Sequence, residues 1–186
     1  VAALIIVTSV MNGFRKEFSD KVINFNGNLT AYVMDMNLDI PDTVATIEKI
    51  AGIEHAIPMV ERHALISNDN QIRGMLVYGI SKGDLHKYRI LRDGICAGSL
   101  ERFNSENTAI LGSALSQKLR MTVGGEVCIL APELDDTGLG LFPVKKTFNL
   151  VAKFKSGMYE YDSNVAIIPI EIAQKLFNIN ASGILI

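Results

Sequence analysis

The 186-residue sequence has no block of basic residues, and its 18 Lys and Arg against 20 Asp and Glu give a net charge of −2. A nucleic-acid-binding domain normally carries a clustered positive surface, so nucleic acid is not an expected partner. Cysteine is also scarce: Cys96 and Cys128 are the two present, and they fit neither a CxxC motif nor a Cys/His metal site. One disulfide in an oxidising compartment stays open as an alternative, but two unpaired, buried thiols are the favoured interpretation.

Motifs that bind nucleotides or build a nucleophile are absent. The sequence contains no GxxxxGK[ST] and no GxGxxG after a strand, which excludes a P-loop and a dinucleotide-binding turn of the usual kind. Ser113 in LGSAL lacks the GxSxG pattern and is interpreted as a helix N-cap. His55, His63 and His86 do not have the spacing of metal ligands. We therefore expect no catalytic residue, no metal site and no cofactor.

Glu160 and Asp162 in YEYD form the remaining candidate for acid–base chemistry. Two carboxylates two residues apart would face one side of an extended chain, as a general acid and base require. A tight loop between two strands is a commoner place for such a pair. An enzyme with its site around residues 159–162 is therefore an alternative that we do not favour.

The first ten residues, VAALIIVTSV, are almost wholly apolar but too few to span a bilayer. They lack an initiator Met and the basic stretch of a signal peptide. Three interpretations are open: a buried helix, a strand, or the cut end of a longer transmembrane helix. Apolar residues then recur at helical spacing and predict an amphipathic helix: Met11, Phe14, Phe18, Val22 and Phe25.

The rest of the pattern predicts an α+β protein. A strand at residues 28–35, a helix at 41–51 and a strand at 55–67 form a β-α-β unit, half of a split βαβ fold. Pro58 places the second strand at a sheet edge or a bulge. From Asn68 short strands predominate and predict an inserted β-rich module. The ending SGILI starts one returning strand, and we expect the chain to be cut at both ends.

The segment APELDDTGLGLFPVKK, residues 131–146, connects two predicted strands and has an unusual composition. Its prolines, its glycines and the Asp135–Asp136 pair fit turn chemistry. Its large apolar side chains do not fit a solvated loop. Either these side chains fold back on the domain as a small cluster, or the segment is a protruding hairpin that offers an apolar surface to a partner.

Three stretches together resemble the lipoprotein-releasing permeases of the LolC/LolE type, which belong to the MacB-like superfamily of ABC transporters. They are TSVMNGFRKEF at residues 8–18, ENTAILGSALSQKLRMTVGGEVCILAP at 106–132, and FKSGMYEYDSNVAIIPIEIAQKLF at 154–177. The most specific element is GMYEYDSN, made of Gly157, Met158, Tyr159, Glu160, Tyr161, Asp162, Ser163 and Asn164. The similarity covers nearly the whole chain.

The resemblance implies a MacB-like periplasmic core domain. Its parts would be a Porter-like βαβ part at residues 28–67, a β-rich Sabre-like module at 68–180, and a returning Porter-like strand at 181–186. Residues 1–27 would be the end of the first transmembrane helix and a stalk helix. The protein would lie in the inner (cytoplasmic) membrane, with this chain on the periplasmic side.

The resemblance also implies partners. A Hook-like hairpin at residues 132–143 would bind a LolA-like periplasmic carrier through Pro132, Leu134, Gly138, Leu139, Gly140, Leu141, Phe142 and Pro143. Outer-membrane lipoproteins, a LolD-like cytoplasmic ATPase and a second permease copy or paralogue would complete the system. Any ATPase activity would belong to that separate subunit. The acidic start of the loop and Gly125, which replaces a family Asp, depart from the family pattern. A MacB-like efflux or mechanotransmission permease that docks an adaptor is the alternative.

Overall fold

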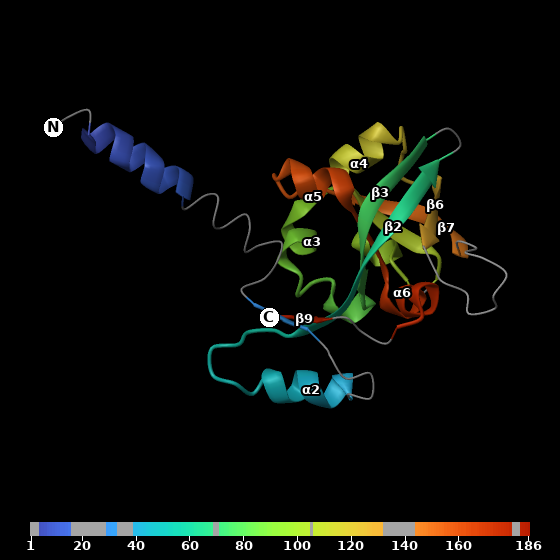
Figure 1. Ribbon diagram of the computed structural model, residues 1–186, viewed down its shortest axis with the longest axis horizontal. Coiled ribbons are helices and arrows are strands. Elements are labelled where there is room, and N and C mark those ends of the chain that lie inside the picture. Colours follow the sequence, from blue (N-terminus) through green and yellow to red (C-terminus); the bar gives the residue numbers. More distant parts are fainter. Residues whose placement is uncertain are drawn as a thin grey trace, which may run out of the picture.

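A computed structural model describes residues 4–15, 29–32, 39–68, 71–104, 106–131, 144–179 and 183–186 of the chain. Residues 4–15 form a helix whose side chains are all exposed (Figure 1). Among the described residues, no helix is both long enough and apolar enough to cross a bilayer. The assignment of residues 1–27 to a membrane helix and a stalk stays a prediction, and residues 16–28 lie outside the described part.

The predicted β-α-β unit is present as β1 (Thr30–Tyr32), α2 (Ile40–Ile47) and β2 (Ile57–Asn68). β9 (Gly183–Leu185) lies between the two strands and pairs antiparallel with each, so the returning strand completes a split βαβ arrangement. Asp39 caps α2 by accepting the Asp42 N–H at 3.2 Å. The helix ends four residues before its predicted end at residue 51. The chain tightens there into turns that lead to Gly52, whose φ is +97°.

Pro58 lies where β2 has a partner on one edge alone, as predicted. It pairs with Ile184 of β9, while the pairing of β2 with β3 (Gln71–Ile80) begins at Met59. A proline cannot donate a backbone hydrogen bond, so it is tolerated where one edge of the strand has no neighbour. β2 then continues to Asn68 without a break and forms a long hairpin with β3.

Six strands pair in a closed ring, each with two neighbours, in the order β2, β3, β8 (Val165–Pro169), β5 (Thr108–Gly112), β7 (Val144–Phe154) and β6 (Glu126–Ala131). All six contribute buried residues to one hydrophobic cluster, for example Ala64, Val77 and Ile129. Because successive side chains of a strand alternate between its two faces, this cluster fills the inside of the ring.

A second cluster covers the outer face of the same strands. It contains Met59 and Ile80 from the hairpin together with Leu91 of α3 (Arg89–Gly94) and Phe103. The remaining elements are β4 (Ile95–Gly98), α4 (Ser113–Lys118), α5 (Tyr159–Asn164), α6 (Ile170–Phe177) and two short 3₁₀ turns, η1 (Lys82–Asp84) and η2 (Leu100–Arg102). Figure 1 shows α4 and α5 at one end of the β2–β3 hairpin and α6 at the other.

Three predictions need correction. The sequence pattern did not predict β4 or α3. Cys96 lies on β4 and is exposed, and Cys128 on β6 is half-buried, so the prediction of two buried thiols is wrong, although both cysteines are free as predicted. Ser113 is the first residue of α4, and Gly112 takes the cap position without a side-chain hydrogen bond. The boundary between a Porter-like and a Sabre-like part at residues 67 and 68 stays a prediction. The strands on the two sides of this boundary belong to one sheet.

Candidate functional site

Within the GMYEYDSN segment, residues 159–164 form a short helix instead of the tight loop between two strands that was predicted. Gly157 has a φ of +81° and turns the chain out of β7, and α5 follows at Tyr159–Asn164. On a helix, residues two apart do not face each other. Glu160 is therefore exposed, whereas Asp162 is buried. The two carboxylates point to different surroundings, which argues against a paired acid–base site.

The Asp162 carboxylate holds the turn that leads into α5. Its Oδ1 accepts the backbone N–H of Ser156 at 2.6 Å and the Ser156 hydroxyl at 2.8 Å. The Ser156 hydroxyl oxygen in turn accepts the Met158 N–H at 3.0 Å. Every partner of this carboxylate named here belongs to its own turn, and charge-assisted bonds of this kind stabilise local structure. We assign Asp162 a structural role.

Two of the family-like stretches meet at α5. A Cβ added to Gly112, between β5 and α4, would lie 2.3 Å from the backbone oxygen of Asp162, so a glycine is required there. The Lys118 ammonium of α4 lies 4.9 Å from the centre of the Tyr159 ring, a cation–π contact. The structure therefore brings together residues that are more than forty positions apart in the sequence.

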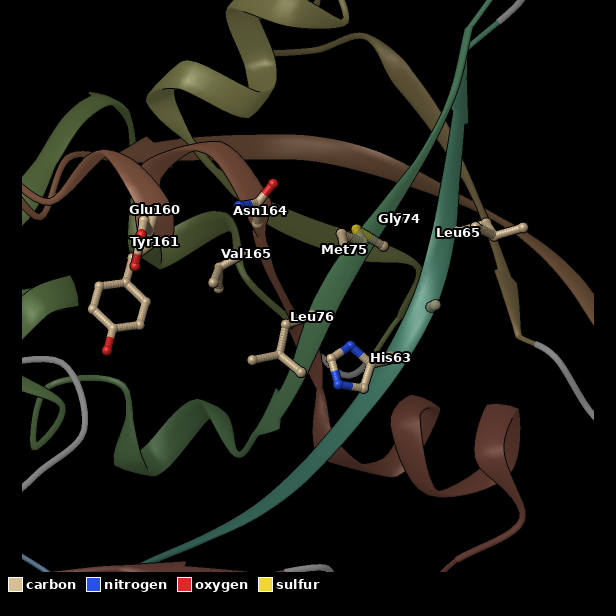
Figure 2. A pocket seen from close by; sticks show the side chains of 10 residues that line it. His63, Leu65, Gly74, Met75, Leu76, Glu160, Tyr161, Asn164 and Val165 are labelled. Atoms are coloured by element: carbon tan, nitrogen blue, oxygen red, sulfur yellow. The ribbon is translucent and has the colours of Figure 1, made fainter.

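An open groove of about 640 Å³ separates α5 from the β2–β3 hairpin (Figure 2). Its hairpin side is lined by His63, Ala64, Leu65, Gly74, Met75 and Leu76. Its other side is lined by Glu160, Tyr161, Asn164 and Val165. The lining is mostly apolar, and its volume lies within the range of ordinary ligand sites.

The acidic charge in this groove comes from the α5 side. Glu160 is its one acidic lining residue, and no Lys or Arg lines it. Next to it on the outer face of the hairpin, burial raises the pKa of the Tyr78 phenol, and the nearby Glu61 carboxylate raises it further. Burial likewise raises the pKa of Tyr88. Both phenols are neutral at ordinary pH, so neither adds negative charge. The described residues hold no group of three possible metal ligands.

The Hook-like segment of residues 132–143, and with it every partner-binding residue predicted there, lies outside the described residues. The strands on either side are described: β6 and β7 pair antiparallel up to Ala131 and Val144. β6 also pairs with β2 from Leu65 to Ser67, while the other end of β2 pairs with β9. One strand, β2, thus runs from β9 at one end to β6 at the other, and β6 ends at Ala131, next to that segment in the sequence.

The sequence argument missed the hairpin side of the groove. A signal was present, because Ala64 and Ile66 face the ring interior while Leu65, between them, is 43% exposed. Ile72 on β3 is also large, apolar and 66% exposed. Apolar residues at successive positions of a strand indicate two apolar faces, and among the described residues no helix covers one of these faces at this end.

The sequence matches the family model of the MacB-like periplasmic core domain over residues 1–186. It is 34% identical to the lipoprotein-releasing system transmembrane protein LolC of Neisseria meningitidis serogroup B over 97% of this chain and 44% of that protein. It is 26% identical to LolC of Xylella fastidiosa over the same shares of both chains. The chain thus spans less than half the length of these relatives.

Two solved structures share the fold. The periplasmic region of MacB from Actinobacillus actinomycetemcomitans has a TM-score of 0.55 and 12% identity, over 88% of this chain and 75% of that one. The extracellular domain of the ABC-type transporter YknZ from Gram-positive bacteria has a TM-score of 0.55 and 10% identity, over 84% and 81%. Likenesses at such low identity concern the fold alone.

Proposed function

Because the chain belongs to the family of MacB-like periplasmic core domains, we propose that it serves an ABC permease that releases lipoproteins from the inner membrane and hands them to a soluble periplasmic carrier. The observation that carries this proposal is the 34% identity to a LolC protein along almost the whole chain. The family and the relatives support the coarser statement that the chain is a periplasmic domain of an ABC permease. Lipoprotein release and delivery to the carrier are the proposed part.

In this proposal the chain binds partners and transmits movement, and it performs no covalent chemistry. A LolD-like ATPase in the cytoplasm would supply the energy through the rest of the permease, and a second permease copy or paralogue would complete the assembly. The run of β2 from β9 to β6 supports a mechanical role. The twelve residues of β2 span about 40 Å. One edge of β2 pairs with β3 from Met59 to Asn68, and the other edge pairs with β9 at residues 57–59 and with β6 at residues 65–67, so one strand links β9 to β6.

The carrier would bind the segment at residues 132–143. Leu139, Leu141 and Phe142 are the apolar anchors in this proposal, and Pro132 and Pro143 limit the segment at its two ends. Burying an apolar side chain of this size contributes about 1.5–3 kcal/mol before ordering costs are subtracted. Two or three such anchors are enough for a specific but reversible contact.

The test is binding of the 186-residue chain to a LolA-like carrier, measured by calorimetry. We expect the double substitution Leu141→Ser and Phe142→Ser to weaken binding at least about tenfold, since two buried apolar contacts are lost. The melting temperature should change little. Ile50→Ser is the matched control, because Ile50 is 56% exposed and lies on the turn after α2.

Two other outcomes would reject the proposal. A large loss of melting temperature with intact carrier binding would show that Leu141 and Phe142 are core residues. Binding to a MacB-type adaptor protein, with no affinity for the carrier, would favour the efflux or mechanotransmission alternative. The shared fold with the MacB periplasmic region is the observation behind that alternative.

A further inference from the structure

The edge of β3 that faces away from β2 has a strand partner over half its length. β8 pairs with β3 from Leu76 to Ile80, and its first residue, Val165, follows directly on α5. Within the described residues no strand pairs with this edge at Gln71–Met75. The groove beside α5 lies where β8 begins, at Val165. The ring of strands is thus incomplete at this one position of its β3–β8 seam.

The register of the hairpin tells which backbone groups are unpaired. Asn68 pairs with Gln71 across a two-residue connection, the position at which a tight hairpin makes a hydrogen-bonded pair. Hydrogen-bonded pairs alternate with non-bonded ones along an antiparallel ladder. The N–H and C=O groups of Gln71 and Arg73 therefore face β2, and those of Ile72 and Gly74 face the open edge.

The side chains next to this edge leave room for another chain. Gly74 has no side chain, and a Cβ built there would meet nothing within 4 Å. Ile72 and Leu65 are 66% and 43% exposed. Natural proteins protect open strand edges with charged side chains, Pro or a covering helix. The stretch 71–75 of β3 holds one charged residue, Arg73, which is exposed and points to the face opposite to Ile72 and Gly74, and it holds no Lys or Pro. An uncovered edge with an apolar surface beside it has the chemistry of a strand-addition site.

We propose that the β3 edge at Gln71–Met75, with the adjoining groove, binds an extended segment of a partner polypeptide as an added strand. The unpaired groups of Ile72 and Gly74 supply the main-chain hydrogen bonds. Leu65 and Leu76 receive alternate apolar side chains of the segment. Glu160, the one carboxylate in a lining that contains no Lys or Arg, selects a Lys or Arg in the segment at the α5 end.

This site is separate from the described strand end, Ala131 of β6, that leads to residues 132–143. β6, which leads into that segment, pairs with the edge of β2 opposite to β3. Peptide binding and carrier binding can therefore be lost independently. A variant that loses one and keeps the other distinguishes failure of this inference from failure of the proposed function.

The probe is the fluorescent peptide acetyl-Thr-Val-Lys-Val-Thr-Val-Thr-amide, titrated into the 186-residue chain labelled with ¹⁵N-glycine. We expect a rise in anisotropy and a shift of the Gly74 amide signal, which the Gly74→Ala variant identifies. The same peptide with every backbone nitrogen methylated keeps its side chains but cannot pair as a strand. It should bind at least about tenfold more weakly.

Two variants of Gly74 separate the backbone from the side chain. Gly74→Pro removes the edge N–H and should weaken probe binding about tenfold. Gly74→Ala keeps the N–H and should bind within about twofold. Glu160→Gln should weaken the Lys-containing probe about threefold and leave a probe with Thr at that position unchanged. If Gly74→Pro unfolds the chain, the methylated probe and the Glu160→Gln variant still test whether the peptide binds at this edge as an added strand.

Four results would overturn the proposal. The first is an unshifted Gly74 signal at millimolar probe, and the second is equal binding of the methylated peptide. The third is a concentration-dependent dimer of the chain that Gly74→Pro abolishes, because it would assign the edge to a second copy. The fourth is binding to phosphatidylethanolamine–phosphatidylglycerol vesicles that Leu65→Ser abolishes and the probe does not compete, because it would assign the groove to lipid.

Discussion

β3 carries a glycine near each end, and the surroundings of the two differ. A Cβ added to Gly79 would lie 2.4 Å from the Cβ of Ala173 on α6 and 3.1 Å from the Cβ of Val60 on β2. A Cβ added to Gly74 would meet nothing within 4 Å. One end of the hairpin is thus fixed by close packing against a helix, and the other is open beside the groove. Close packing holds the Gly79 end of the hairpin in place, whereas the Gly74 end is available to a partner.

The largest expected difference in the free energy of unfolding is between substitutions at two successive residues of β2, Leu65 and Ile66, at the open end of the hairpin. Ile66 faces the ring interior and is fully buried, whereas Leu65 is 43% exposed. Ile66→Ala should lower the free energy of unfolding by about 2–5 kcal/mol, because it leaves a cavity. Leu65→Ala should change it by about 0.5 kcal/mol or less. Urea denaturation measures both. Equal losses would mean that the open end has no uncovered face.

The two glycines give the next largest contrast. Gly79→Ala should lower the free energy of unfolding by about 2–3 kcal/mol, because the new methyl group must displace α6 or β2. Gly74→Ala should leave it unchanged or raise it by about 0.5 kcal/mol, through the lower entropy of the unfolded chain. Thermal unfolding of the two variants compares them directly. A destabilised Gly74→Ala would show that the groove is closed in solution.

Much of the fold could be predicted from the sequence, because periodicity records which faces are buried. The β-α-β unit, the strand-rich part that follows it and the returning strand were predicted from apolar spacing and turn residues. The family resemblance is confirmed by the match over residues 1–186. These elements bury a regular stripe of side chains, so their pattern is visible in one dimension.

The missed features depend on contacts between distant residues. α5 is a six-residue helix whose turn is held by Asp162 and Ser156, and YEYD alone has no helical period. β4 exists because it pairs with β7, and four residues carry too little alternation to be recognised. Predicting the groove required knowing that β8 starts beside Leu76, and this depends on the pairing of β3 with β8, two strands that are more than eighty residues apart in the sequence.

The turn at α5 borders the open end and gives a smaller contrast. Asp162→Ala should lower the free energy of unfolding by about 1–2 kcal/mol, because the Ser156 N–H and hydroxyl lose their acceptor. Ser156 is half-buried, so water can replace part of the lost bonding. Glu160→Ala, on the exposed side of the same helix, should change stability by less than about 0.5 kcal/mol. Similar losses would contradict the structural role of Asp162.

Cys128 gives the smallest expected effect. It lies on β6 and pairs with Ser67 on the edge of β2 opposite to β3, so its thiol reports on that edge at the open end of the hairpin. Partial burial raises the pKa of its thiol above the ordinary value of 9.0, while Lys145 and the backbone N–H of Lys146 partly oppose this. In a Cys96→Ser background, alkylation by iodoacetamide should therefore rise with pH at a midpoint above 9.0. The same chain in guanidinium gives the unfolded reference.

The same shift predicts how stability depends on pH. The native thiol holds its proton more tightly than the unfolded one, so its contribution is fully present below the unfolded pKa and is lost as pH rises through the native value. Cys128→Ser should remove the fall in stability that Cys128 causes above pH 9.0, and it should leave the slope of the stability profile near neutral pH unchanged. A native midpoint at or below the midpoint in guanidinium would mean that Cys128 is as solvated as an unfolded thiol. The open end would then extend across β2 to β6, and the groove would not be confined to the β3 edge.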